Sequence, residues 1–199
     1  MNKSSQKNIE LELKLLNEIS KTKEHSQRSI SKTLNVALGL ANAIIKKFVK
    51  KGFLKLKQAP MKRYFYYLTP KGLVEKAKLT KEFLESSLEF YSKARENYEE
   101  LFKSLKNNKK KIILAGKSEL TEIAILASKI QNVNVDLIYS PEIKEEYFCG
   151  LKVINDLYKK KLTKANTCFI LTEFSNPKSI YRKLKKDFDV LKPKFLIIE

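Results

Sequence analysis

The chain has 199 residues and a formal net charge of +19 at pH 7. This length can hold two domains with separate cores. The charge is far from the neutrality of a typical cytosolic enzyme. Residues 1–72 alone carry 16 basic and 4 acidic side chains, a net +12. Such a concentration of positive charge favours a polyanionic partner, because binding to phosphates releases condensed counterions.

The sequence gives little support for a membrane protein or a metal-binding protein. No apolar run is long enough to span a bilayer, and the first residues lack the apolar core of a signal peptide. We therefore expect a soluble, cytoplasmic protein without a membrane partner. Cys149 and Cys168 are isolated, and His25 is the one histidine. We expect no metal site and interpret both cysteines as small buried side chains.

Three helical patterns open the chain. The first runs from about residue 8 to 20 and carries more apolar surface than it could leave in water. A second helix begins at Ser26, whose hydroxyl can cap it, and Asn35 suits the tight turn that follows. A third helix extends from about residue 37 to 51, and Gly52 is the residue type that commonly ends a helix. The sequence thus predicts a helix-turn-helix.

The apolar period changes from helical to strand-like after this motif. Residues 53–57 and 63–68 alternate, and residues 58–61 can form a turn between them. Lys62 and Arg63 lie beside the tip of the predicted hairpin. In a winged helix such a hairpin lies along the DNA backbone, while the preceding helix enters the major groove. We expect most aromatic residues of the second strand to pack on the helices.

Several short segments in the first half of the chain resemble one family. They are Ser26-Gln27-Arg28, the helix through Gly39 and Asn42, residues 51–55, and the turn Thr69-Pro70-Lys71-Gly72 with the sequence that follows it to Leu84. Together they resemble the MarR-type winged helix-turn-helix transcriptional regulators associated with exopolysaccharide gene clusters. Ala37 stands where that family tends to have a serine, and Leu40 where it tends to have a lysine.

The resemblance implies a regulator that binds double-stranded DNA and controls surface-polysaccharide genes. Together with the motif, it predicts DNA contacts from ten residues: Ser26, Gln27, Arg28, Ala37, Gly39, Leu40, Asn42, Lys46, Lys62 and Arg63. Among these, Asn42 is the candidate for reading adenine edges, because amides pair well with them in the major groove.

An uninterrupted helical pattern follows from Thr80, a candidate cap, to about Lys106. Its apolar stripe consists of Leu84, Leu88, Tyr91, Tyr98, Phe102 and Leu105. We expect this stripe to form a homodimer interface, since symmetric dimers are the commonest oligomers. The alternative is a long helix that lies on the domains of its own chain. Residues 107–111 indicate a solvated linker.

Strand-like and helical patterns alternate in the C-terminal half. The expected strands are residues 111–115, 133–139, 152–154, 167–171 and 195–198, and the expected helices begin after Ser118 and lie around 156–162 and 177–191. This alternation predicts a parallel sheet with helices on its faces. Residues 149–153 are also similar to a segment of the Rossmann-like domains that precede sugar acyltransferases.

The default ligand pocket of such a sheet lies at the carboxyl ends of its strands. Gly116, Lys117, Ser118 and Glu119 are expected there, where helix amides could hold an anion. The dinucleotide fingerprint is absent because Gly116 stands alone. We expect no cofactor and favour a structural or partner-binding role, with a bound nucleotide, nucleotide-sugar or other small-molecule effector as the alternative.

The predicted fold class is an α/β multidomain protein. A winged helix-turn-helix occupies residues 1–79, a long connecting or dimerisation helix residues 80–108, and a Rossmann-like parallel α/β sheet residues 109–199. The predicted function is a dimeric, sequence-specific transcriptional regulator without enzymatic activity. Two alternatives are a sugar- or nucleotide-modifying enzyme with a basic anchoring domain, and a non-specific nucleic-acid-binding protein.

Overall fold

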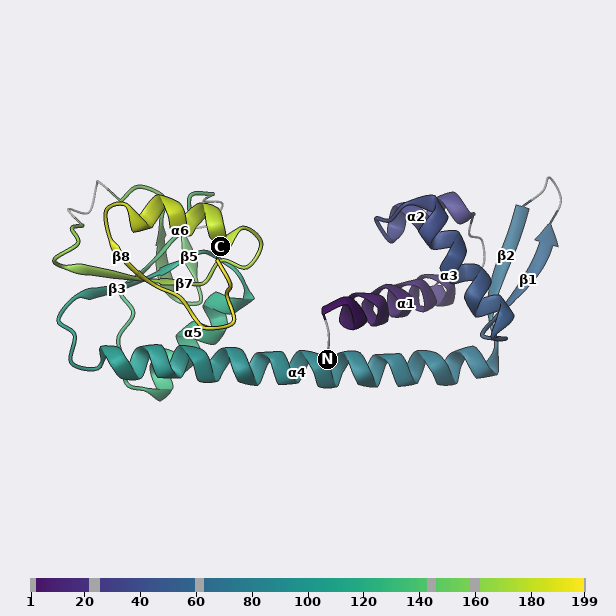
Figure 1. The fold of residues 1–199 in the computed structure, drawn as a ribbon, viewed down its shortest axis with the longest axis horizontal. Helices are drawn as coiled ribbons and strands as arrows, with labels where there is room; N and C mark the ends of the chain where they lie inside the picture. The colour runs from purple at the N-terminus through teal and green to yellow at the C-terminus, as the bar shows by residue number, and fades with distance from the viewer. Residues whose placement is uncertain (1–2, 22–25, 60–62, 143–145, 158–161, 199) are drawn as a thin grey trace. The chain divides into compact units, whose positions relative to one another are not determined.

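The computed structural model describes residues 3–21, 26–59, 63–142, 146–157 and 162–198. The chain divides into two compact units, residues 1–88 and residues 89–199. Helix α4 (Pro70–Leu105) contributes to both units (Figure 1). Within the described ranges, no helix has the length and apolar character needed to cross a membrane.

The N-terminal unit has the predicted winged helix-turn-helix architecture. Its elements are α1 (Lys3–Lys21), α2 (Gln27–Thr33), α3 (Leu38–Lys50), β1 (Leu54–Ala59), β2 (Arg63–Leu68) and the first half of α4. Strands β1 and β2 form an antiparallel hairpin in which Leu54 lies opposite Leu68 and Lys57 opposite Phe65. The core joins buried residues of all three helices and the hairpin, among them Leu16, Ile30, Phe48 and Tyr66.

Helix α4 begins ten residues earlier than expected, at Pro70, and the prediction that Thr80 caps it is wrong. The Thr69 side chain accepts a hydrogen bond from the backbone N–H of Gly72 at 3.0 Å and donates to the Gly52 carbonyl at 2.7 Å. Pro70 suits the first helical position because it has no N–H to satisfy there. Thr80 lies inside the helix, where its hydroxyl donates to the carbonyl of Lys76 at 2.8 Å.

The C-terminal unit contains a six-stranded sheet in the order β5-β6-β4-β3-β7-β8. The strands are β3 (Lys111–Ala115), β4 (Leu137–Tyr139), β5 (Tyr147–Phe148), β6 (Leu151–Ile154), β7 (Thr167–Leu171) and β8 (Asp189–Leu191). Only the edge strand β5 is antiparallel to its neighbour. Helix α6 (Pro177–Lys185) lies over one face of the sheet, and α5 (Glu119–Ile130) and the second half of α4 lie over the other (Figure 1).

Four expected elements of this unit differ from the structure. The helix predicted over 177–191 ends at Lys185, and residues 189–191 instead form β8 beside β7. Residues 195–198 are not a strand, because Phe195 packs its ring on Phe90 and Tyr98 of α4. Of the helix expected around 156–162, residues 156, 157 and 162 are not helical, and residues 158–161 lie outside the described residues. Strand β4 is also shorter than expected.

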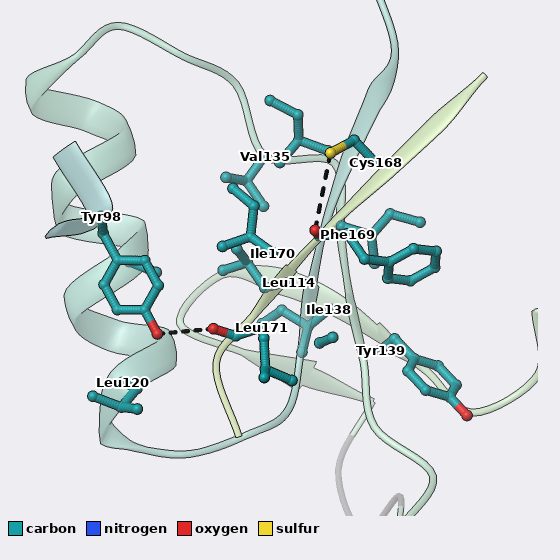
Figure 2. Close-up of a cluster of buried hydrophobic side chains, with 14 of the residues drawn as sticks. Tyr98, Leu114, Leu120, Val135, Ile138, Tyr139, Cys168, Phe169, Ile170 and Leu171 are labelled. Carbon is teal, nitrogen blue, oxygen red and sulfur yellow. Dashed lines mark hydrogen bonds between the residues drawn. The ribbon is translucent and has the colours of Figure 1, made fainter. Parts of the chain in front are cut away.

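The core of the C-terminal unit covers part of the stripe assigned to a dimer interface. Tyr98, Phe102 and Leu105 are buried together with residues of β3, β4 and β7. The hydroxyl of Tyr98 donates to the carbonyl of Leu171 at 2.9 Å (Figure 2). Burial raises the pKa of the Tyr98 hydroxyl, which therefore stays protonated. The expectation that these three residues lie in a dimer interface is wrong, because the sheet of their own chain covers them.

The prediction that both cysteines are buried holds for one of them. Cys168 on β7 is buried as expected, and burial raises the pKa of its thiol. Cys149 is exposed, contrary to expectation, in the turn between β5 and β6. Its φ of 49° suits this turn.

Candidate nucleic-acid interface

Local hydrogen bonds fix the start of α2 and the turn between α2 and α3. The Ser26 hydroxyl oxygen accepts from the Ser29 N–H at 3.0 Å, and the Ser29 hydroxyl oxygen accepts from the Ser26 N–H at 3.1 Å. This reciprocal cap confirms the predicted start of α2. Asn35 has a φ of 51°, and the Val36 N–H donates to the Ser31 carbonyl at 3.0 Å. The start of α2 and the turn after it therefore involve Ser26 and Asn35, the two residues that the sequence identified.

The end of α3 is joined directly to the hairpin. Gly52 has a φ of +74°, a conformation that glycine adopts without a steric cost. The next residue, Phe53, donates its N–H to the Phe48 carbonyl at 2.9 Å, and the two rings pack edge to face with centroids 5.5 Å apart. Because α3 leads into β1 through these contacts, the helix and the hairpin are held together as one surface.

Gly72 fixes the other end of the hairpin. A Cβ at this position would lie 2.1 Å from the carbonyl oxygen of Phe53, so no other residue fits there without a shift of the backbone. The Thr69 hydroxyl also donates to this carbonyl, at 3.1 Å. The Thr-Pro-Lys-Gly turn therefore has a structural role: it anchors the start of α4 against the junction of α3 and β1.

Two of the predicted DNA-contacting residues in α2 have partners within the protein. The Ser26 hydroxyl belongs to the helix cap described above. Gln27 donates from Nε2 to the Tyr66 hydroxyl at 3.2 Å and thereby connects α2 to the second strand of the hairpin. Arg28 is exposed. Of these three residues, Arg28 is therefore the best placed for a phosphate.

The predicted contacts in α3 lie mainly on its exposed side. Gly39, Leu40 and Lys46 are exposed, whereas the helix buries Ala41, Ile44, Ile45 and Phe48. Ala37 precedes the helix and makes no capping hydrogen bond, because its methyl side chain has no acceptor. Asn42 is half-buried, and its Oδ1 has no hydrogen-bond partner among the described residues.

Both α3 and the hairpin carry exposed lysines. Lys46 and Lys50 are exposed on the helix, and Lys55 and Lys57 are exposed on one face of β1, two residues apart. Lys47 differs because its ammonium is paired with the carboxylate of Glu12 on α1. Lys62 lies outside the described residues, and the side chain of Arg63 is outside them as well. The described residues thus supply four exposed lysines on α3 and β1 without either tip residue.

One exposed residue was not expected from the sequence. Leu38, the first residue of α3, is 41% exposed. Helical spacing gives no signal for it, because Leu38 lies three residues before the buried Ala41 and so follows the spacing of the buried side chains.

In the C-terminal unit, the four predicted pocket residues have different roles. Gly116 has a φ of +123°, and a Cβ there would lie 2.4 Å from the backbone nitrogen of Glu173, so its role is close packing. Ser118 caps α5 by accepting from the Leu120 N–H at 3.2 Å and donates to the Thr172 carbonyl at 2.6 Å. Glu119 is exposed, and the Lys117 ammonium lies 5.2 Å from the centre of the Phe148 ring.

A cavity of about 330 Å³ lies at the carboxyl ends of β4 and β7. Its lining includes Lys117, Ser140, Glu142, Glu173, Asn176 and Ser179. Lys117 is the one residue of the predicted four that lines it. Among the residues that the structure describes, no group of three or more histidines, cysteines and carboxylates could hold a metal ion.

Comparison with known proteins gives one family match and several similar folds. A model described as a winged helix-turn-helix DNA-binding domain matches residues 10–55. No curated protein matches the chain. Among solved structures, the chain is similar to FabT of Streptococcus pneumoniae in complex with DNA, with 21% identity, a TM-score of 0.33, and coverage of 61% of this chain and 69% of that one. It is also similar to ZitR of Lactococcus lactis, described as a zinc-responsive MarR family member, with 17% identity, a TM-score of 0.33, and coverage of 66% and 76%.

At these scores, neither structure assigns the whole chain to a family. The family match covers most of α1, then α2, α3 and the start of the hairpin. The N-terminal unit is therefore a winged helix-turn-helix of the DNA-binding type.

Proposed function

We propose that the protein is a sequence-specific transcriptional regulator that binds duplex DNA as a dimer. The observation that carries the proposal is the exposed side of α3 with Lys46 and Lys50, joined directly to a hairpin with exposed lysines in a unit of the winged helix-turn-helix type. A helix of this kind enters the major groove, and the hairpin beside it follows the backbone. The net +12 of residues 1–72 supports the same partner.

A salt titration tests the phosphate contacts. Replacing Lys55 and Lys57 with alanine should weaken binding to every duplex and flatten the dependence of log K on log salt by about one to two units, because each phosphate contact contributes roughly one unit. Lys178→Ala with Arg182→Ala removes the same charge from exposed positions of α6 and serves as the control. Fluorescence anisotropy measures the slopes. If all three proteins have the same slope, the hairpin does not bind phosphates.

The dimer rests on the first half of α4. Leu84 and Leu88 are 55% and 57% exposed, and with the exposed Leu73 they fall on one face of the helix at 3.6 residues per turn. A second copy would cover this face and place two winged helices on two half-sites, so that each contact strengthens the other. Tyr91 of the predicted stripe is partly exposed as well.

Sedimentation equilibrium tests the dimer. Leu84→Glu with Leu88→Glu should convert the protein to a monomer, because an interface would have to bury two unpaired carboxylates. Leu126→Glu, at an exposed position of α5, is the matched control and should stay dimeric. A wild-type protein that sediments as a monomer contradicts the dimer.

For the C-terminal unit we propose a Rossmann-like domain that senses a ligand or serves as a scaffold. Across the sheet, the parallel strands lie in the order β6-β4-β3-β7-β8. Numbered from one to five as they follow along the chain, they have the order 3-2-1-4-5, which matches the doubly wound order. The order reverses between β3 and β7, and ligands of such sheets bind at that point outside the carboxyl ends. The cavity beside Lys117 supports a small-molecule effector.

The regulated genes are the most specific part of the proposal. The sequence resemblance implies control of surface-polysaccharide genes. Genome-wide mapping of the DNA bound by this protein tests that assignment. Binding sites distributed without preference would favour a non-specific nucleic-acid-binding protein instead.

A further inference from the structure

The first turn of α3 is apolar and exposed. Leu38 is 41% exposed and Leu40 is 47% exposed. Gly39 lies between them, and apart from its chain neighbours and the backbone of its own helix, no described atom lies within 4 Å of the place where its Cβ would be. We call these three residues the apolar first turn. The buried residues of α3 begin at Ala41. The two leucines flank this turn on opposite sides, since residues two apart lie about 200° apart around a helix, and Leu40 also borders a groove with Leu11 of α1.

Hydrogen-bonding side chains are scarce at this end of the helix. Beyond the apolar first turn, the exposed side continues with Ala43, and the amide of Asn42 is half-buried. The lysines of the exposed side, Lys46 and Lys50, follow in the second half of α3. Helix-turn-helix proteins contact base edges chiefly with the N-terminal residues of this helix. The part of α3 that would reach the bases is therefore mainly apolar.

Thymine is the base that offers an apolar group to such a surface. In the major groove, the base pairs present hydrogen-bond donors and acceptors, and the 5-methyl group of thymine is an apolar group beside them. We propose that the apolar first turn recognises thymine by its methyl groups, a specificity that rests on the proposed DNA-binding function. The lysines farther along α3 favour DNA over an apolar protein partner, because they match the charge of a polyanion.

The test compares duplexes that differ in this methyl group alone. The full-length protein is titrated by fluorescence anisotropy, at one salt concentration, with alternating d(A-T) and alternating d(A-U) duplexes. Wild-type protein should bind the d(A-T) duplex about fourfold more tightly, or more, because burial of one methyl group is worth about that factor. The variant Leu38→Ala with Leu40→Ala should reduce the ratio of the two affinities to about one.

The variants separate recognition from other causes. Leu126→Ala removes a leucine of similar exposure on α5 and should keep the wild-type ratio. Any difference in duplex shape between the two probes would act on all three proteins alike. Because Leu38 and Leu40 are exposed, circular dichroism should show the double variant folded as the wild type is.

The possible results have distinct meanings. Equal wild-type affinity for the two duplexes overturns thymine recognition while leaving DNA binding in place. A wild-type preference that survives in the double variant assigns the methyl contact to another part of the protein and also overturns the proposal. Binding to neither duplex contradicts the proposed function itself.

Discussion

The two halves of helix α4 carry similar apolar residues on one face but differ in what covers them. In the N-terminal unit, Leu73, Leu84 and Leu88 are more than half exposed. In the C-terminal unit, Tyr98 and Phe102 are fully buried against the sheet. The opposite side of the first half faces its own unit through the buried Leu79. The same helical stripe therefore serves as a core in one unit and as a free surface in the other.

This difference limits what an apolar stripe can predict. Heptad-like spacing indicates that a helix needs a partner, but it does not tell whether the partner is a second copy or a sheet of the same chain. The strands that cover Tyr98 and Phe102 come from residues 111–115 and 167–171, far along the chain. A surface for self-association should accordingly be sought in the first half of α4, around Leu84 and Leu88.

The largest effect is expected when the same charge is placed on each half of α4. Tyr98→Glu should destabilise the C-terminal unit by about 4 kcal/mol or more, because it buries an unpaired carboxylate in the core. Leu88→Glu should change the free energy of unfolding by at most about 0.5 kcal/mol in the monomer, because the site is exposed. Urea denaturation followed by circular dichroism measures both. Similar losses in the two variants would show that the halves do not differ.

A smaller effect is expected where α4 begins. Gly72→Ala should cost about 2–3 kcal/mol, since the added methyl group collides with the Phe53 carbonyl and the backbone must move. Gly39→Ala adds the same methyl group to a helix at an open position and is the matched control. Thermal denaturation of the two variants checks this prediction. If Gly72→Ala is as stable as Gly39→Ala, the turn does not anchor α4 as described.

The smallest predicted effect concerns one hydrogen bond. Tyr98→Phe should cost about 1–2 kcal/mol, because it leaves the Leu171 carbonyl without its partner while the ring still fills the core. Amide hydrogen exchange along β7, compared between wild type and variant, would sharpen the result by locating the loss. An unchanged exchange pattern there would indicate that this bond does not hold α4 to the sheet.

Much of the N-terminal unit could be predicted because its signals are local. The Ser26 cap depends on Ser29, three residues away, and the end of α3 depends on the positive φ of Gly52. Thr69 and Pro70 also form a local start signal for α4. The expectation placed the start at Thr80 because it gave weight to a later threonine whose hydroxyl bonds within the helix instead.

The errors in the C-terminal unit arise from contacts between distant residues. Residues 195–198 look like a strand, but Phe195 packs on α4, and the sheet edge beside β7 is taken by β8. The candidate pocket was only partly predictable for a similar reason. Gly116 was identified by its residue type, but the backbone that packs against it is that of Glu173, far along the chain. The cavity likewise combines residues that follow β3, β4 and β7.

The central claim is that the N-terminal unit binds duplex DNA through α3 and the hairpin. An NMR titration of the isotopically labelled full-length protein with an alternating d(A-T) duplex tests it most directly, because each backbone amide gives its own signal. The account predicts that chemical-shift changes concentrate in residues 26–68, with the largest around Leu38–Lys50 and along β1 and β2. Changes confined to residues 89–199, or a spectrum that the duplex leaves unchanged, would contradict it.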